Sequence, residues 1–316
     1  MTHITEIVNQ VLPVLFLLLL GNWIRRREFL SASVIDGLRA MVVNLALPAV
    51  LFLSFVEIEL KLAYLVLFAL IFGLCIALYG LGVLLKRAFH IDHPYFPFLI
   101  TGFEYGMLGI SLFGSAYELD QIGHIAVLAL GHETFIWFVF LALLLMRRDG
   151  IQSPRKLVGQ FFRSPVIVAI LTGMTLNLLG AQASLSTLPV VGALTSTLEL
   201  LGNLTIPIIL IIVGYGIRFD REGAQEALVV VAIRLTLLIP LALALNALVI
   251  RRLLGLEWLF EAALFTLLIL PPPFIVPLYM RQGLDDEQRY VNNVLMLHAV
   301  ISIAIYAVYF ALNAWR

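Results

Sequence analysis

Two stretches decide how this chain folds: Gly102-Phe103-Glu104-Tyr105-Gly106-Met107-Leu108-Gly109-Ile110-Ser111 and Pro271-Pro272-Pro273-Phe274-Ile275-Val276-Pro277. Both lie inside long apolar segments. Three consecutive prolines remove successive amide donors and clash with the preceding turn, so an α-helix cannot continue through them. The first stretch combines helix-weakening glycines with a carboxylate in the middle of its segment. Both segments are therefore predicted to be helices that break near the middle.

The composition of the chain requires a lipid environment. Of 316 residues, 62% are hydrophobic and 13% are charged, and the mean hydropathy is +1.03. A water-soluble domain of this size would expose far too much apolar surface. The net charge is zero and no basic or acidic tail is present, so no nucleic-acid partner is expected. The lipid bilayer is the expected surrounding.

Ten segments satisfy the length requirement of a transmembrane helix, which is about 17–25 predominantly apolar residues. The predicted spans are 8–24, 34–56, 62–85, 95–118, 122–146, 164–181, 196–217, 224–250, 259–281 and 289–314. They predict an all-α membrane protein. Because the number of spans is even, both termini lie on the same side of the membrane.

Lysine and arginine residues set the predicted orientation, because short loops rich in them stay in the cytoplasm. The loops that follow spans one, three, five, seven and nine carry 14 of these residues, and the opposite side carries 4. The remaining two, Arg39 and Arg234, fall within spans. Both termini are therefore expected outside the cytoplasm.

The second and seventh spans share a sequence pattern. Asn44-Leu45-Ala46-Leu47-Pro48-Ala49-Val50-Leu51 corresponds to Asn203-Leu204-Thr205-Ile206-Pro207-Ile208-Ile209-Leu210 at an offset of 159 residues. The first and sixth spans also match, with Pro13-Val14-Leu15 and Gly21 corresponding to Pro165-Val166-Ile167 and Gly173 at an offset of 152 residues. Two matches in the same order favour an internal duplication over chance.

Each copy contains an odd number of spans, so the second copy must enter the membrane upside down relative to the first. The predicted organisation is a first five-helix repeat over 1–148, a cytoplasmic linker over 149–163 and a second, inverted five-helix repeat over 164–316. Inverted repeats are typical of transporters that expose one site alternately to the two sides of the membrane. Duplication for packing alone is the alternative.

The broken fourth and ninth helices predict the position of a binding site. Irregular backbone at membrane depth is tolerated only where protein or a water-lined cavity satisfies its polar groups. Second half-helices that begin near Leu108 and Pro273 would point positive dipole ends at the middle of the membrane and favour an anion. The candidate substrate-binding residues are Asn44, Tyr105, Gly106, Gly109, Ser111, Asn203, Pro271, Pro272, Pro273, Phe274 and His298.

Ionisable residues at a similar depth are candidates for the coupling of transport to a proton or cation, since a charge at the bilayer centre is costly and needs a partner or a purpose. These residues are Glu104, Glu133 and Arg234. Glu104 is the first candidate because it alone lies on a broken helix. An ion pair of Arg234 with Glu104 or Glu133 that only locks helices together is the alternative. No cofactor is expected beyond a coupling ion, H⁺ or Na⁺, and no metal site.

The chain resembles the auxin efflux carrier family, which includes bacterial malonate-type carriers and plant auxin exporters. The matching segments are Leu12-Pro13-Val14 with Gly21 and Arg25-Arg26-Arg27, then 44–52, Ser164-Pro165-Val166-Ile167, Ile206-Pro207, and Arg234 with Pro240. The resemblance implies ten helices in two inverted repeats, crossing fourth and ninth helices, and transport of small organic anions. It also makes a homodimer an expected assembly.

The fourth span departs from the family pattern, which usually has asparagine and a later proline around the glycines, where this chain has Glu104 and Ser111. A carboxylate in place of an amide repels an anionic substrate unless it is protonated. The departure therefore indicates either proton coupling or a less acidic substrate. The long cytoplasmic loop of the plant exporters is missing, which fits a short carrier of the bacterial inner (plasma) membrane.

The predicted function is therefore a secondary active transporter of small organic anions, and three other classes are alternatives. An intramembrane zinc protease is disfavoured, because His132-Glu133 is followed by Ile136 where the second histidine ligand would stand. A membrane-embedded ligand sensor would bind the same molecule without transport. A channel would give flux that neither saturates nor couples to a gradient.

Overall fold

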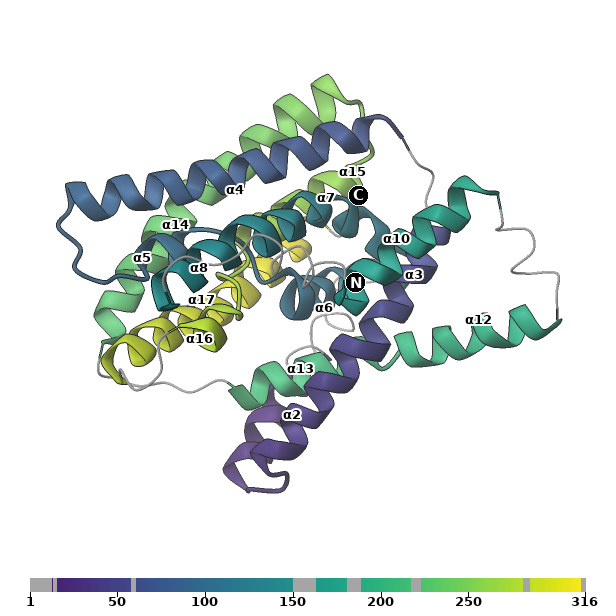
Figure 1. Ribbon diagram of the computed structural model, residues 1–316, viewed down its shortest axis with the longest axis horizontal. Helices are drawn as coiled ribbons and strands as arrows, with labels where there is room; N and C mark the ends of the chain where they lie inside the picture. The colour runs from purple at the N-terminus through teal and green to yellow at the C-terminus, as the bar shows by residue number, and fades with distance from the viewer. Residues whose placement is uncertain are drawn as a thin grey trace.

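The computed structural model describes residues 13, 16–57, 61–149, 163–180, 189–216, 223–280 and 285–313. Within these residues all regular secondary structure is helical and no β-strand occurs (Figure 1). The predicted all-α class is confirmed. Most of the predicted linker, together with the start of the first predicted span, lies outside the described residues.

Helices follow one another along the whole described chain. After a first helix that includes 16–26, the elements are α2 (Ala32–Met41), α3 (Leu47–Glu57), α4 (Ala63–Ala88), α5 (Phe96–Ile100), α6 (Ile110–Tyr117), α7 (Ile122–Phe135), α8 (Leu141–Asp149), α10 (Pro165–Leu178), α12 (Pro189–Gly202), α13 (Thr205–Gly216), α14 (Ala224–Leu245), α15 (Trp258–Ile269), α16 (Val276–Tyr279) and α17 (Asp285–Asn313). Wide π-helical turns connect several of them without a loop, for example Val42–Ala46 between α2 and α3.

Seven helical segments of the described chain are long and apolar enough to cross a membrane. They are Ala32–Val56, Ala63–Ala88, Phe96–Tyr117, Leu119–Arg148, Val190–Gly216, Ala224–Leu253 and Asp286–Asn313. They coincide with predicted spans two to five, seven, eight and ten. The sixth and ninth predicted spans contain shorter apolar helices, Pro165–Leu178 and Trp258–Ile269.

The seventh span begins earlier than the hydropathy pattern indicates, at Pro189 instead of residue 196. The additional turns, 189–195, are mainly apolar and contain the hydroxyl residue Thr195, and Thr197 follows within the predicted span. Thr195 and Thr197 donate their side-chain hydroxyls to the carbonyls of Val191 and Ala193, one helical turn earlier, at 3.1 and 2.8 Å. Because these hydroxyls are satisfied within the helix, they are compatible with a membrane.

The paired sequence patterns of the second and seventh spans coincide with paired distortions of the two helices. A proline has no amide hydrogen, so the carbonyl four residues earlier loses its helical donor. That carbonyl belongs to Asn44 for Pro48 and to Asn203 for Pro207. The helix of the second span widens into the π-helical turn Val42–Ala46, and the helix of the seventh span is interrupted by a turn at 203–204. The same local chemistry therefore distorts both helices.

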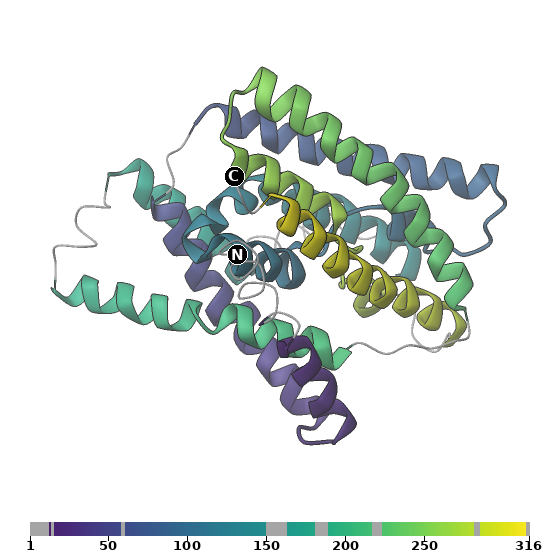
Figure 2. The same cartoon turned by 180° about the vertical axis from the view of Figure 1, so that it is seen from behind.

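The helices form two groups. The flank helices are the first helix, α2, α3, α10, α12 and α13, in which the first helix contacts α13 at Gly21, α3 packs against α10 and α12, and α2 packs against α13. The core helices are α4 to α8 and α14 to α17, in which α4 packs against α7, α14 against α17, and α15 against both α7 and α14. Figures 1 and 2 show α4 and α14 at one edge of the molecule and α3, α10 and α12 at the opposite edge.

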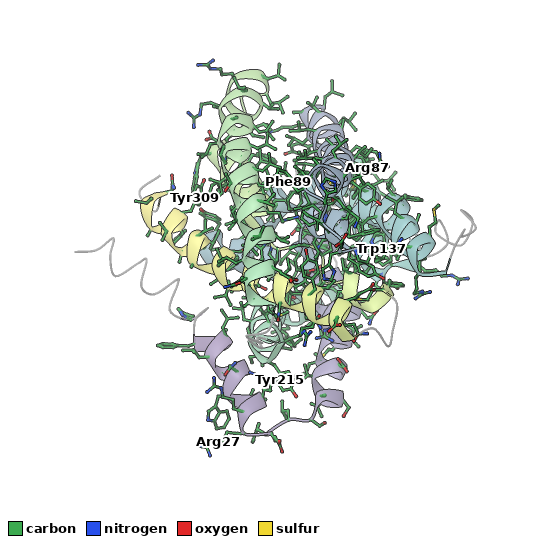
Figure 3. The ribbon with its side chains drawn as sticks, turned by 90° about the vertical axis from the view of Figure 1, so that its left-hand side faces the viewer. Arg27, Arg87, Phe89, Trp137, Tyr215 and Tyr309 are labelled. Carbon is green, nitrogen blue, oxygen red and sulfur yellow. The ribbon has the colours of Figure 1, made fainter. Side chains whose placement is uncertain are left out.

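The turn between the first helix and α2 stands apart from both groups. Figure 3 shows Arg27 on this turn at the lower edge of the molecule. The neighbouring backbone is left-handed at Glu28, with φ of 51°. Arg25 and Arg26 end the first helix and Arg27 begins the turn, and together they form the first of the basic clusters from which the orientation is predicted.

Glycines allow the flank helices to approach one another closely. A Cβ atom at Gly21 would overlap the carbonyl oxygen of Ile211 on α13, and a Cβ atom at Gly173 on α10 would lie 2.7 Å from the carbonyl oxygen of Phe52 on α3. Small residues at such crossings permit backbone-to-backbone contact between membrane helices. The two contacts join the first helix to α13 and α10 to α3.

We predict that Gly173→Ala lowers the melting temperature of the detergent-purified protein, because the added methyl group forces α10 away from α3, at a cost of about 1–3 kcal/mol. The matched control is Gly192→Ala on α12, where an added Cβ meets nothing within 4 Å. Differential scanning fluorimetry measures both. Equal melting temperatures for the two variants would show that the α10–α3 contact is looser than described.

Candidate functional site

The two predicted breaks are present, and they touch. α5 ends at Ile100 and the helix resumes at Tyr105, while α15 ends at Ile269 and α16 begins at Val276. Across the gap the Glu104 amide donates to the Pro271 carbonyl at 2.8 Å. Gly102 has φ of +70°, and a Cβ there would lie 2.8 Å from Cγ of Pro273. Only glycine combines this conformation with this approach, so Gly102 allows the two breaks to meet.

The second half-helices start at other residues than predicted. The helix resumes at Tyr105 rather than near Leu108, because the turn Tyr105–Gly109 is π-helical and leads directly into α6. The ninth span resumes at Val276 instead of Pro273, and α16 has only four residues.

Arg234 on α14 holds the carbonyl groups that the breaks leave without helical partners. Its guanidinium donates to the carbonyls of Leu99 (3.2 Å), Gly102 (2.7 Å) and Leu270 (3.0 Å). The side chain is fully buried, and its Cζ lies 5.4 Å from the centre of the Phe103 ring. A planar cation with several donors in a fixed geometry suits converging carbonyls. Arg234 is therefore a positioning residue of the two breaks.

His132 on α7 holds the first break from the other side. Its Nε2 accepts the Phe103 amide at 2.9 Å, so this nitrogen carries no proton. Its Nδ1 lies 3.2 Å from Oε1 of Glu133 and must be the donor of that bond. The geometry therefore defines a neutral ring with its proton on Nδ1. The other oxygen of Glu133 accepts from Nε1 of Trp137 at 3.2 Å.

Glu104 bonds to both broken segments. Its Oε2 accepts the amide of Phe274 at 2.6 Å, and its Oε1 accepts the amide of Met107 at 3.3 Å. The residue is 8% exposed. Among the described residues, the carboxylates of Glu104 and Glu133 thus bond to these donors and not to Arg234. The predicted alternative of an ion pair with Arg234 does not fit this arrangement.

A cavity of about 400 Å³ lies at the meeting point of the breaks, between the flank and core helices. The flank helices contribute Arg39, Val42, Val43, Leu47, Ser164 and Val166 to its lining. The core contributes Phe103, Glu104, Tyr105, Gly106, Met107, His132, Glu133, Ile136, Trp137, Pro273, Phe274, Ile275, Pro277, Asn292, Leu295 and Met296. The walls are mainly apolar, with a few polar groups, as in small-molecule sites.

The structure brings about half of the predicted residues to this cavity. Those that line it are Glu104, Tyr105, Gly106, Glu133, Pro273 and Phe274. Those that lie outside its lining are Asn44, Gly109, Ser111, Asn203, Arg234, Pro271, Pro272 and His298. Pro271, Pro272 and His298 are buried behind the breaks, and Ser111 donates to the Met107 carbonyl of its own helix at 2.6 Å.

The two asparagines of the repeated pattern do not meet at the cavity. Asn44 is exposed, and its side chain donates to the Ala40 carbonyl of its own helix at 2.7 Å. Asn203 lines a second cavity of about 560 Å³, also between flank and core helices. In that second cavity His124 of α7 contacts Oε1 of Glu257 at 2.9 Å. The pattern around each asparagine is explained by the bend of its helix.

Some lining residues were not predicted as site residues. Arg39 lies at the flank side, where its guanidinium pairs with Asp36 at 2.7 Å. Trp137 and Asn292 complete the core side. Arg39 could have been found as a basic residue within a predicted span. The sequence also indicated Trp137, because it follows Glu133 by one helical turn and therefore lies on the same face of the helix.

We predict that Arg234→Lys lowers the melting temperature by several degrees, because an ammonium group cannot span three carbonyls and each unsatisfied buried group costs about 1–3 kcal/mol. The matched control is Arg251→Lys, at an exposed arginine that pairs with Glu261. Thermal unfolding of both purified variants measures the difference. Unchanged stability of Arg234→Lys would contradict the role of Arg234 as the group that holds the breaks.

A known protein family matches almost the whole chain. Residues 6–310 match the family model described as membrane transport protein, which represents the auxin efflux carrier family. No curated protein matches the chain. The match covers nearly the whole chain and confirms the resemblance inferred from its motifs. This chain is a multi-pass membrane protein of the auxin efflux carrier family, whose members are transporters.

Proposed function

We propose that this chain is a secondary active transporter of small organic anions, coupled to protons or sodium ions, that works by alternating access. The observation that supports this proposal most directly is the contact between the two breaks at a cavity between the flank and core helices. Discontinuous helices that meet at a binding site are typical of secondary transporters. The described chain places backbone donors and two carboxylates at that point.

The proposed architecture is ten helices in two inverted repeats, 1–148 and 164–316, joined by 149–163. Two reciprocal contacts support it. Gly21 packs on Ile211, and Gly173 packs on Phe52. Gly21 and Gly173 differ by 152 positions and Phe52 and Ile211 by 159, the two offsets of the repeated sequence patterns. A pseudo-two-fold axis that exchanges the repeats would convert each contact into the other. The bends at Asn44 and Asn203 obey the same relation.

The proposed orientation places both termini outside the cytoplasm in a bacterial inner membrane, on the basis of the basic loops. In this orientation Arg39, Ser164 and Asn292 lie near the cytoplasmic ends of their helices. They line the cavity at the breaks. Lys61, Asp120 and Glu257 lie near the opposite ends and line the second cavity. The described conformation therefore corresponds to one in which the breaks face the cytoplasm.

The proposed substrate is a small organic acid with an apolar body. A cavity of about 400 Å³ with mainly apolar walls fits such a molecule, and its backbone amides at Met107 and Phe274 suit a carboxylate. Glu104 is the proposed coupling group, because it is the buried acid that touches both breaks. A homodimer is the proposed assembly, and the lipid bilayer is its surrounding.

Uptake of labelled malonate and benzoate into proteoliposomes tests this proposal. We expect saturable uptake that an imposed pH or sodium gradient drives above equilibrium. Glu104→Gln is expected to lose most of the gradient dependence, because an amide neither ionises nor binds a cation as a carboxylate does. The matched control, Glu226→Gln at an exposed position on α14, should behave as the wild type. Binding without uptake would indicate a sensor, and uptake that neither saturates nor couples would indicate a channel.

A further inference from the structure

We propose that Glu104 is an internal ligand of the substrate site. Its carboxylate occupies the position that the carboxylate of the substrate takes during transport. This inference rests on the proposed function and adds how the substrate gains access. The substrate displaces a carboxylate that is already bound, and it does so when Glu104 takes up a proton. Glu104 therefore acts both as an occupant of the site and as the group that releases it.

The first observation is that the bonds of Glu104 exceed what a helix cap requires. Glu104 is the N-cap of the helix that starts at Tyr105, and its bond to the Met107 amide is a capping bond. The shorter bond, 2.6 Å to the Phe274 amide, crosses to a segment 170 residues away. That amide follows three prolines and lies before α16. The carboxylate thus occupies a two-amide site built by both broken segments.

The second observation is that the cavity has room beside this carboxylate and that a residue of its lining carries a hydroxyl without a partner. A Cβ at Gly106 would meet nothing within 4 Å, so the wall next to Glu104 is open. Tyr105 lines the same cavity and is 2% exposed, and its hydroxyl has no hydrogen-bond partner in the described chain. A buried hydroxyl without a partner is uncommon and indicates a site for a ligand or water.

The third observation concerns the other charged groups around the cavity. The titratable side chains that line it besides Glu104 are Arg39, Tyr105, His132 and Glu133, and Arg234 bonds the carbonyls behind the break. Both oxygens of Glu133 are bonded by side chains, His132 and Trp137, and neither contacts an amide of the breaks. Glu104 is therefore the acid that competes with an incoming carboxylate.

The exchange balances in charge. Two carboxylates within a few ångströms cannot both stay ionised at low cost, because like charges repel strongly at a largely buried site, and Glu104 is 8% exposed. Before binding, the two amides hold the ionised Glu104. After binding, Glu104 carries one proton and the amides hold the substrate carboxylate, so the net charge of the site is unchanged. One proton enters with each carboxylate group.

Thermal unfolding of the full-length protein in detergent with formate as the probe tests the proposal. Glu104→Ala should melt below the wild type at pH 7.5. Sodium formate should raise its melting temperature by several degrees in a saturable manner, because formate takes the empty place at the two amides and stabilises the form that binds it. Sodium chloride at equal concentration should not. The wild type should show no formate-specific shift at this pH and should acquire one as the pH falls.

The matched control is Ser111→Ala, which removes a buried polar group from the same half-helix without removing an anion. It should show no shift with formate. A Glu104→Ala protein that elutes as a single species and shows no formate-specific shift would overturn the proposal. An equal shift in the wild type at pH 7.5 would overturn it as well, because the site would then be free in the presence of Glu104.

A second variant keeps the test decisive if Glu104→Ala does not fold. Glu104→Gln preserves size and removes the exchangeable charge. The concentration of labelled benzoate that gives half-maximal uptake should rise about tenfold per pH unit in the wild type, at pH values above the titration of Glu104. In Glu104→Gln this concentration should not depend on pH. Identical pH profiles would overturn the proposal. If formate binds Glu104→Ala but the wild type shows no uptake, the proposed transport function is contradicted, whereas the proposed role of Glu104 as an internal ligand stands. The failure of one proposal can therefore be told from the failure of the other.

Discussion

The structure depends on the satisfaction of backbone groups that two broken helices expose at membrane depth. A peptide group without a partner in hydrocarbon costs several kcal/mol, so helices in membranes rarely break without compensation. Here each kind of exposed group has an assigned partner. Arg234 takes three carbonyls, His132 takes the Phe103 amide, and Glu104 takes the amides of Met107 and Phe274. These three side chains come from α14, α7 and the first break, and they hold the core helices around one point.

The bonds that hold the breaks and the cavity beside them lie in different parts of the structure. Bonds that satisfy the breaks lie within the core helices, whereas the cavity lies between the core and the flank helices. The flank helices pack tightly on one another through Gly21 and Gly173. A relative displacement of the two groups would therefore carry the intact meeting point of the breaks from one side of the membrane to the other, which is what alternating access requires.

Part of the fold and of the candidate site could be predicted from local chemistry. Pro271-Pro272-Pro273 and the glycines near Glu104 disrupt a helix wherever it lies, so the breaks and the carboxylate between them follow from the sequence. The partners of the breaks could not be predicted from the sequence. Whether Arg234 contacts Glu104 or three carbonyls depends on how segments more than a hundred residues apart pack together. Asn44 and Asn203 were expected at the site on a repeated pattern, but each lies at the bend caused by the proline four residues later.

Accessibility of a cysteine at the breaks tests the central claim that they face a water-filled cavity. Gly106 is suited to this, because a Cβ atom added there meets nothing within 4 Å, and the native Cys75 is buried. The measurement is the labelling of Gly106→Cys by a membrane-impermeant maleimide in inside-out and right-side-out vesicles. We expect rapid labelling from the cytoplasmic side, slowed by a bound carboxylate. Labelling only by a lipid-soluble reagent, or from neither side, would contradict it.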